Sequence, residues 1–343
     1  MTIGAGYELG AQSYVAIFKE SVYGTYPTPY ATNAAIEPLS IGFKTEIVSQ
    51  KLDTINRNRG FSKRVMLDKN VTGSMESYLH PEESVIPLAV TLGGGIVSST
   101  LTVGAWQHLL TAGNLDTSPS SLSMLVRKGS TTHFQYTGGR VNVCTITGSV
   151  GELIKISYDM IFKDSSQTGS DWSNTLSVSA ITPFTYVHGT FWWADTEASL
   201  TSTAAEQITS FELTINNNLI SDNNVRALGS NVLQSLPPTR REIGLKITQR
   251  FDTTTAWSRF INNSSGAIML FMESPVAIGA SNQKYTCKIT LPKVYYTSPD
   301  PIVGSPNEIL MQDINVDCVV DTPQTSTGKD ITVTFFNQVQ TYA

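Results

Sequence analysis

The chain has 343 residues, of which 40% are hydrophobic and only 15% are charged, with a formal net charge of −5. This length supports a large core, and polar surface supplied by Ser, Thr, Asn and Gln favours β-sheets over solvated helices. The acidic balance and the absence of Lys/Arg-rich runs exclude a conventional nucleic-acid-binding surface, which needs basic residues against phosphates.

The N-terminal residues 1–30 are predicted to form an arm that lies outside the repeated part of the chain. They lack the basic start and apolar stretch of a signal peptide, and no apolar run in the chain reaches the length of a membrane span. We therefore expect a protein without a membrane anchor that is made in the cytoplasm.

The first predicted strand is 36–43, in which Leu39, Ile41 and Phe43 alternate onto one face. It is followed by Lys44–Asn70, which is polar and is predicted to be a long loop. Loops of this length inside a compact domain are usually functional or disordered.

A second strand and a short helix are predicted next. The strand is indicated by the alternation of apolar residues over 71–79. Val85, Leu88 and Ala89 then have the i, i+3, i+4 spacing of a short amphipathic helix. Gly93-Gly94-Gly95 is predicted to end that helix, because it lacks the Lys-Ser/Thr of a phosphate-binding loop.

The same pattern returns 172 positions later. The matching strands are 208–215 and 243–251, and the matching helix carries Trp257, Phe260 and Ile261. Further on the offset falls to 156, and a longer loop in the first copy, between Gly93 and Ser121, is expected to absorb the difference. A shared register over two strands, a loop and a helix indicates an internal duplication.

Four later strands are expected in each copy. They are Leu122–Arg127, Thr132–Tyr136, Val141–Ser149 and Leu153–Phe162 in the first copy, and Ala267–Met272, Gln283–Thr290, Lys293–Thr297 and Glu308–Val320 in the second. Turn signals at 137–139 and 298–301 separate some of them. The predicted fold is mainly β, with tandem duplicated antiparallel β-sandwich or half-barrel domains over residues 31–170 and 171–321, each with one short α-helix.

A C-terminal extension, residues 322–343, follows the second copy. Ile331–Phe336 has the composition of a strand for which no partner within the chain is obvious. Two interpretations stay open: the strand adds to the sheet of a neighbouring subunit, which we favour, or it closes the sheet of its own domain.

No catalytic site, metal site or cofactor is predicted. The four histidines are scattered without a pairing pattern, and Cys144, Cys287 and Cys318 are too widely spaced for a metal site, which indicates buried free thiols in strands. An aromatic cluster over 184–193 is predicted to pack in the core or in an interface. The alternative is a glycan-binding or adhesion module that would use Trp192 or Trp193.

Several segments, in this order and spacing, resemble the tail tube proteins of bacteriophages with long non-contractile tails. They are KESVYGTYP (Lys19–Pro27), GSMESYLHPE (Gly73–Glu82), FQYTGGRVN (Phe134–Asn142), FELTINNNL (Phe211–Leu219) and LPKV (Leu291–Val294). The resemblance covers the chain from about Gly10 to Val320. It is closest to the type of tail tube protein in which two domains are fused in one chain.

The resemblance implies a structural subunit of a siphovirus tail, found in the virion and made in the host bacterial cytoplasm. Trimers would form pseudo-sixfold rings that stack into a hollow conduit for double-stranded DNA during ejection. The implied partners are further copies of the chain, the tape measure protein, and the distal tail and tail terminator proteins. An inner tube inside a contractile sheath, or a distal tail ring, is the alternative within the same assembly.

Two sets of residues follow from this interpretation. In similar proteins the loop after the first strand reaches the adjacent ring, so arginines in Lys44–Asn70 and Asn216–Glu242 are candidates for contacts between rings: Arg57, Arg59, Arg64, Arg226, Arg240 and Arg241. A DNA conduit needs acidic or neutral walls. Acidic residues opposite the apolar strand positions are therefore candidates for the lumen: Glu76, Asp159, Asp313 and Asp317.

Overall fold

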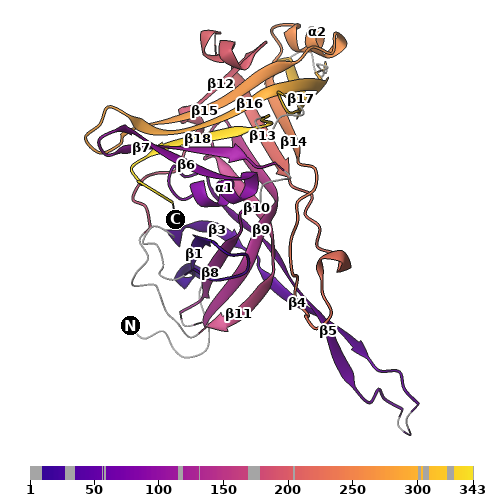
Figure 1. Cartoon of the computed structure of the whole chain (residues 1–343). Coiled ribbons are helices and arrows are strands. Elements are labelled where there is room, and N and C mark those ends of the chain that lie inside the picture. The colour runs from indigo at the N-terminus through magenta and orange to yellow at the C-terminus, as the bar shows by residue number, and fades with distance from the viewer. Residues whose placement is uncertain are drawn as a thin grey trace.

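The computed structural model describes residues 10–27, 35–55, 57, 59–114, 119–130, 132–168, 178–203, 205–299, 303, 309–322 and 328–342 (Figure 1). One antiparallel sheet runs through both halves of the chain. Its strands are, in order across the sheet, β4 (Lys44–Lys51) with β3 (Pro38–Ile41), β5 (Arg64–Tyr78), β10 (Lys155–Phe162), β9 (Thr132–Ser149), β13 (Ile208–Asn216), β14 (Glu242–Arg250), β17 (Met311–Cys318) and β16 (Lys284–Ser298). The prediction of a mainly β fold is confirmed.

Further strands pack against this sheet and enclose the core. Beside the second half they are β12 (Gly189–Ala194), β15 (Gly266–Ala277), the start of β16, β18 (Thr332–Asn337), β7 (Ala105–Ala112) and β6 (Gly93–Thr102). Beside the first half they are β2 (Ala35–Ile36), β1 (Tyr14–Lys19), β8 (Leu122–Lys128), the start of β9 and β11 (Asp164–Thr168). A single cluster of buried apolar side chains, from Val15 to Phe335, spans both halves.

Strand β1 lies inside the segment that was predicted to be a separate arm. It pairs with β8, and its Val15 and Ile17 side chains are fully buried in the core. Residues 1–9 and 28–30 of that segment lie outside the described residues.

The predicted turn at 137–139 and the predicted break between the strands 283–290 and 293–297 are wrong, because a single long strand crosses each of them, whereas the turn signal at 298–301 begins where β16 ends. Residues 132–136 and 141–149 are both parts of β9, and residues 284–290 and 293–297 are both parts of β16. In β9 the chain passes from the smaller sheet to the main sheet at Gly138 and Gly139. Gly138 has a φ of +63°, which glycine adopts without strain, so the signal read as a turn is a bend within a strand.

The loop predicted between Gly93 and Ser121 is also wrong over most of its length. Residues 93–112 form the hairpin β6–β7, and this insertion accounts for the change in the repeat offset. The C-terminal strand β18 lies between β7 and β16 and pairs with both. It therefore closes the sheet within its own chain, and the prediction that it joins a neighbouring subunit is wrong.

Corresponding strands pair alike in the two halves, although one register differs from the prediction. Ile41 lies opposite Met75, and Phe211 lies opposite Ile247. The first strands therefore correspond at an offset of 170, whereas β5 and β14 correspond at 172. The difference is even, so the alternation between faces is the same in both copies. Both copies have the same register irregularity, between Pro38 and Ser40 and between Ile208 and Ser210, so the two-residue difference lies in the connection to the next strand.

Both predicted helices are present, and their environments differ. Every residue of α1 (Val85–Leu92) is buried, and Gly93 ends the helix in a left-handed conformation. In α2 (Thr255–Ile261) only Ala256 is buried, whereas Trp257 and Ile261 are 44% and 57% exposed. The predicted apolar face is therefore fully buried in α1, whereas in α2 only Ala256 and, partly, Phe260 pack against the core. Neither helix is long and apolar enough to cross a membrane.

Short 3-10 helices complete the described elements: η1 (Gly10–Gln12), η2 (Tyr186–His188), η3 (Glu197–Ser202) and η4 (Asn223–Val225). The three cysteines are free, as predicted. Cys144 and Cys287 are buried in β9 and β16, and Cys318 is partly buried at the end of β17.

Candidate functional site: an acidic sheet face and a projecting hairpin

One face of the main sheet is open, and small and acidic side chains are the commonest on it. The best defined row crosses six strands in register: Glu76, Ser157, Thr145, Thr214, Gly244 and Asp317. The alternate positions face the core, where Met75, Ile156 and Leu213 are fully buried. This alternation arises because successive side chains of a strand point to opposite sides of the sheet.

All four acidic residues predicted to line a lumen lie on this open face. Asp159, Asp313 and Asp317 are exposed, and Glu76 is partly exposed. They come from β5, β10 and β17, which the chain order separates widely but the sheet brings together.

Sequence reasoning missed two further carboxylates on the same face, Glu212 of β13 and Glu242 of β14. The signal was present, because Glu212 lies between Phe211 and Leu213 in an alternating strand. Basic residues of the face include Lys44, which lies opposite Thr72, together with Lys155, Lys246 and Arg250, so the six carboxylates outnumber these four. The Nζ of Lys246 is 3.7 Å from a carboxylate oxygen of Asp313.

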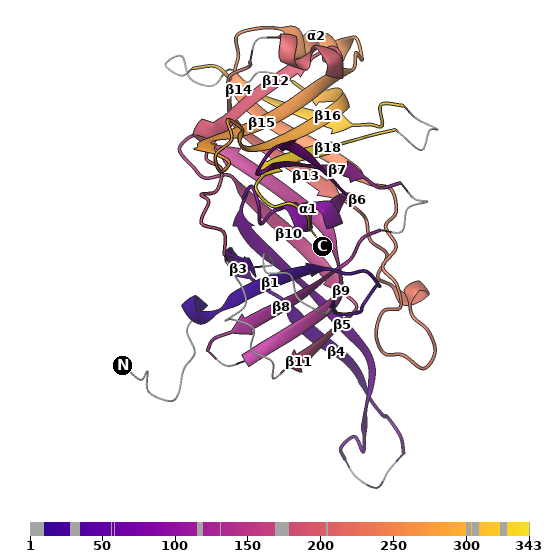
Figure 2. The ribbon, with the colours of Figure 1, turned by 60° about the vertical axis from the view of Figure 1, so that its left-hand side comes forward.

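The segment Lys44–Asn70, predicted to be a loop, is largely a two-stranded ribbon. β4 pairs with the first part of β5 from Lys44 opposite Thr72 to Lys51 opposite Arg64. The ribbon projects far from the rest of the molecule (Figures 1 and 2). Polarity suggested a loop, but the ladder of backbone hydrogen bonds between the two strands gives the segment regular structure.

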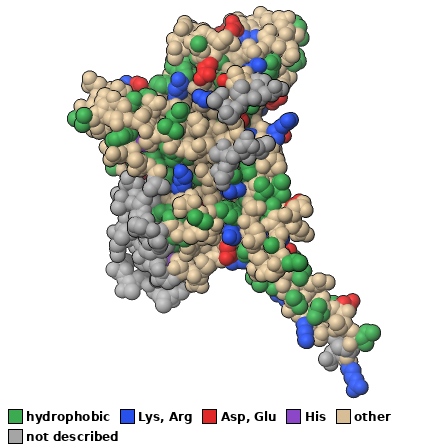
Figure 3. Space-filling view, in the orientation of Figure 1, with side chains coloured by type: hydrophobic (Ala, Val, Ile, Leu, Met, Phe, Trp, Pro, Cys, Tyr) green, Lys and Arg blue, Asp and Glu red, His purple; other side chains and the backbone are tan. Residues whose placement is uncertain are grey.

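The ribbon carries apolar side chains that its own chain leaves exposed (Figure 3). They are Ile47, Val48, Ile55, Phe61, Val65, Met66 and Leu67, each at least 37% exposed. An isolated hairpin is only marginally stable in water, and clustered exposed apolar residues mark interaction sites. The ribbon is therefore a candidate for contact with another subunit.

Three of the candidate arginines lie on this ribbon. Arg57 and Arg59 are exposed near its tip, and Arg64 begins the described part of β5. The Nε of Arg64 donates a hydrogen bond to Ser49 Oγ across the ribbon, with a distance of 2.6 Å.

The second predicted loop, Asn216–Glu242, is a loop as expected, but it folds back onto the body. Apart from η4 it has no regular element. Val225, Leu233 and Leu236 are buried in a cluster against Tyr23 and Ile161 of the first half.

Two arginines of this loop make contacts within the chain. Arg226 lies 3.5 Å from the carboxylate of Asp68 and donates a hydrogen bond to Asn70 Oδ1. Arg241 forms an ion pair with Asp330 at 3.0 Å and donates to the backbone oxygens of Leu92 and Gly113.

Arg240, next to Arg241, is exposed. The structure therefore separates the candidates into two groups. Arg57, Arg59 and Arg240 have exposed side chains, whereas Arg226 and Arg241 form ion pairs within the chain. Arg64 is exposed and also bonded to Ser49.

The aromatic cluster predicted to pack in the core does so fully for three of its members, and Trp192 is partly buried against Phe271. Phe184, Phe191 and Trp193 are at most 6% exposed, and the Trp193 ring packs edge-on against Tyr296. Tyr186 is 44% exposed. In the described part of the chain no group of three or more His, Cys, Asp or Glu residues is arranged to hold a metal ion.

A comparison with protein families finds a match, which covers nearly all of the β strands. Residues 10–319 match the family described as phage tail tube protein. A comparison with curated proteins finds no match. The match covers most of the chain, from before β1 to the end of β17. The chain therefore belongs to the phage tail tube protein family.

Proposed function

We propose that three copies of the chain form a pseudo-sixfold ring, and that rings stack into the hollow tube through which phage DNA passes during ejection. The main observation that supports a ring is the contact between the two halves of the chain. Ser210–Asn216 of β13 pairs along Val143–Ser149 of β9, which makes one sheet from two repeats. The same contact, repeated between chains, would continue the sheet around a ring.

The edge needed for that contact is present in the first half. Residues 40–46 of β3 and β4 correspond to 210–216 of β13, and each of these two strands pairs with β5 on one side. No described strand pairs with their other edge. In the next chain this edge would pair with residues 298–304, which correspond to Val143–Ser149 of β9. Most of residues 298–304 lie outside the described residues. Six repeats from three chains would close the ring.

The excess of carboxylates on the open sheet face supports the proposal that this face lines the lumen. Phosphates are repelled by carboxylates, so DNA can move past such a wall without binding to it. Replacing Glu76, Asp159, Asp313 and Asp317 by Lys should slow DNA ejection from assembled phage. Ejection at the wild-type rate would contradict the assignment of this face, although not the tube itself.

The projecting ribbon supports a role in stacking. Its exposed apolar side chains and its arginines Arg57, Arg59 and Arg64 would contact the adjacent ring, with Arg240 at the same end of the sheet. Arg226 and Arg241 would act indirectly, by holding the second loop in place. The tape measure, distal tail and tail terminator proteins are the further partners proposed, and the role is structural rather than catalytic.

Negative-stain electron microscopy of the purified protein, at rising concentration and salt, tests the proposal. Stacked rings or hollow tubes with a six-lobed end view are the expected result. Discrete particles under every condition, together with glycan binding that is lost on Trp192→Ala, would replace the tube by an adhesion module. Tubes enclosed by a contractile sheath in intact phage would instead reassign the type of tail.

A further inference from the structure

Two unpartnered apolar features lie at opposite ends of the strands of the main sheet. The ribbon leaves the end at which β10 finishes at Phe162 and β14 begins at Glu242. A cavity opens at the other end, beside Ser149 of β9 and Arg250 of β14. Subunits that stack head to tail would bring these two ends together.

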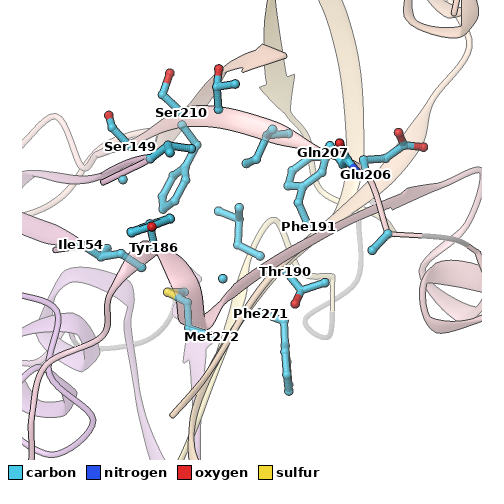
Figure 4. A pocket seen from close by; sticks show the side chains of 18 of the residues that line it. Ser149, Ile154, Tyr186, Thr190, Phe191, Glu206, Gln207, Ser210, Phe271 and Met272 are labelled. Atoms are coloured by element: carbon cyan, nitrogen blue, oxygen red, sulfur yellow. The ribbon is translucent and has the colours of Figure 1, made fainter. Parts of the chain in front are cut away.

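The cavity has a volume of about 510 Å³ and is lined mainly by apolar side chains (Figure 4). Ile154, Phe191, Phe211 and Met272 are among them, and Tyr186 lies beside Ile154. This volume is within the range of roughly 300–1,000 Å³ that is usual for sites binding whole ligands.

The rim of the cavity is apolar and exposed as well. Val150 is 62% exposed and Tyr186 44%, and Val187, which follows Tyr186 in the chain, is 70% exposed. Such a patch around a cavity is typical of an interaction site rather than of free surface. Nothing in the described part of the chain fills it.

The ribbon offers side chains of matching character. Ile55 is fully exposed near its tip, and Phe61 is 60% exposed on the returning arm, with the Nζ of Lys51 5.4 Å from its ring centroid. Beyond Lys69, whose N–H donates to the Asn231 oxygen, about nine residues lead to the tip. At the rise of a strand they reach roughly 30 Å from the body.

The charges of the two features are opposite. Residues 51–64 contain five basic residues and one acidic residue, Asp53, which gives a net charge of +4. Glu206 and Arg250 line the cavity, and the exposed Glu152 lies between Val150 and Ile154, so its mouth has two acidic residues and one basic residue. Opposite charge favours the correct pairing of the two ends and opposes the pairing of two like ends.

We propose that the tip of the ribbon, with Ile55 and Phe61, inserts into this cavity on a second copy of the chain in the adjacent ring. The inference rests on the proposed function and adds to it the receiving site. Apolar burial supplies the contact, and the basic residues of the ribbon meet the acidic rim. The occupant is therefore a second copy of this chain rather than a small molecule.

The test is a cross-link in assembled tubes. Phe61→Cys and Thr190→Cys are combined in a Cys318→Ala background, since Cys144 and Cys287 are fully buried. Thr190 lines the cavity and is only partly exposed. A short bismaleimide should produce a ladder of covalent oligomers. The control pairs Phe61→Cys with Val103→Cys, which is 96% exposed and lies outside the cavity, and should give at least tenfold less cross-linking.

The results distinguish failure of the ribbon–cavity contact from failure of the proposed function. Tubes that form normally but cross-link no more than the control would overturn the ribbon–cavity contact and leave the tube intact. Failure of the unmodified protein to form any ring or tube would contradict the proposed function and the inference together.

A second variant tests the same contact without a cross-linking reagent. Phe61→Asp is expected to lower the fraction of protein in tubes at least tenfold while leaving the thermal unfolding of the free subunit unchanged. Val103→Asp is the matched control and should assemble normally. Wild-type assembly of Phe61→Asp would overturn the inference.

Discussion

The connections β4–β5 and β13–β14 occupy the same place in the two halves, yet the first projects as a ribbon and the second folds onto the body. The ribbon exposes Phe61 and Ile55, whereas the loop buries Leu233 and Leu236. Both contain arginines, and both are rich in polar residues. A duplicated segment can therefore differ between the copies: in one it exposes apolar side chains to other molecules, and in the other it packs against its own chain.

The largest expected effect concerns Arg241, the arginine of the loop that is paired with Asp330. Arg241→Ala should lower the free energy of unfolding by about 3 kcal/mol, because it leaves the largely buried carboxylate of Asp330 without its partner and removes the hydrogen bonds to the Leu92 and Gly113 oxygens. Urea denaturation of the unassembled subunit measures this. Its neighbour Arg240 is the control, and Arg240→Ala should change stability by no more than about 0.5 kcal/mol. Equal effects would erase the distinction between the two arginines.

Burial of apolar residues in the loop gives the next effect. Leu236 is fully buried, so Leu236→Ala should cost about 2–3 kcal/mol through lost burial and the cavity left behind. Leu228 of the same loop is fully exposed and provides the matched control. The midpoint of urea unfolding should fall for the first variant only. A loop that unfolds independently of the body would leave both midpoints unchanged.

A smaller effect is expected where the loop meets the base of the ribbon. Arg226→Ala removes an ion pair to Asp68 and hydrogen bonds to Asn70 and Asn231, and should cost about 1.5–2 kcal/mol. Hydrogen exchange should also speed up at the amide of Lys69, which donates to the Asn231 oxygen. Unchanged exchange at Lys69 would show that the loop does not brace the ribbon.

The ribbon should give the smallest change in subunit stability. Replacing Arg57 and Arg59 together by Ala should alter the free energy of unfolding by no more than about 0.5 kcal/mol, because both are exposed. Limited trypsin digestion sharpens the point: the free subunit should be cut first at these two arginines and later at Arg226 and Arg241. Assembly into tubes should protect the ribbon. Early cleavage in the loop instead would reverse the comparison.

Much of the fold could be predicted from the sequence because alternation of apolar residues is a local property. The alternation over Ile243–Ile247 marks a strand, and the spacing of Val85, Leu88 and Ala89 marks a helix, whatever lies around them. The same alternation placed Asp159 and Asp317 opposite the core, and both lie on the open face.

What failed depended on partners that are distant in the chain. The sequence shows no obvious partner for strand β18, because its partner β7 precedes it by more than 200 residues and lies where the sequence predicts a loop. The glycines at 138 and 139 signal a turn equally well as a bend between two layers. Only the sheet to which each flanking strand pairs decides between them.

Side-chain periodicity and residue type are enough to predict the β class, the duplication pattern and the side of each strand on which carboxylates lie. Which arginines are exposed and which are bonded depends on the packing of distant parts of the chain. Arg241 and Arg240 are adjacent and chemically identical, and they differ because the carbonyl oxygens of Leu92 and Gly113 and the carboxylate of Asp330 converge on one and not on the other.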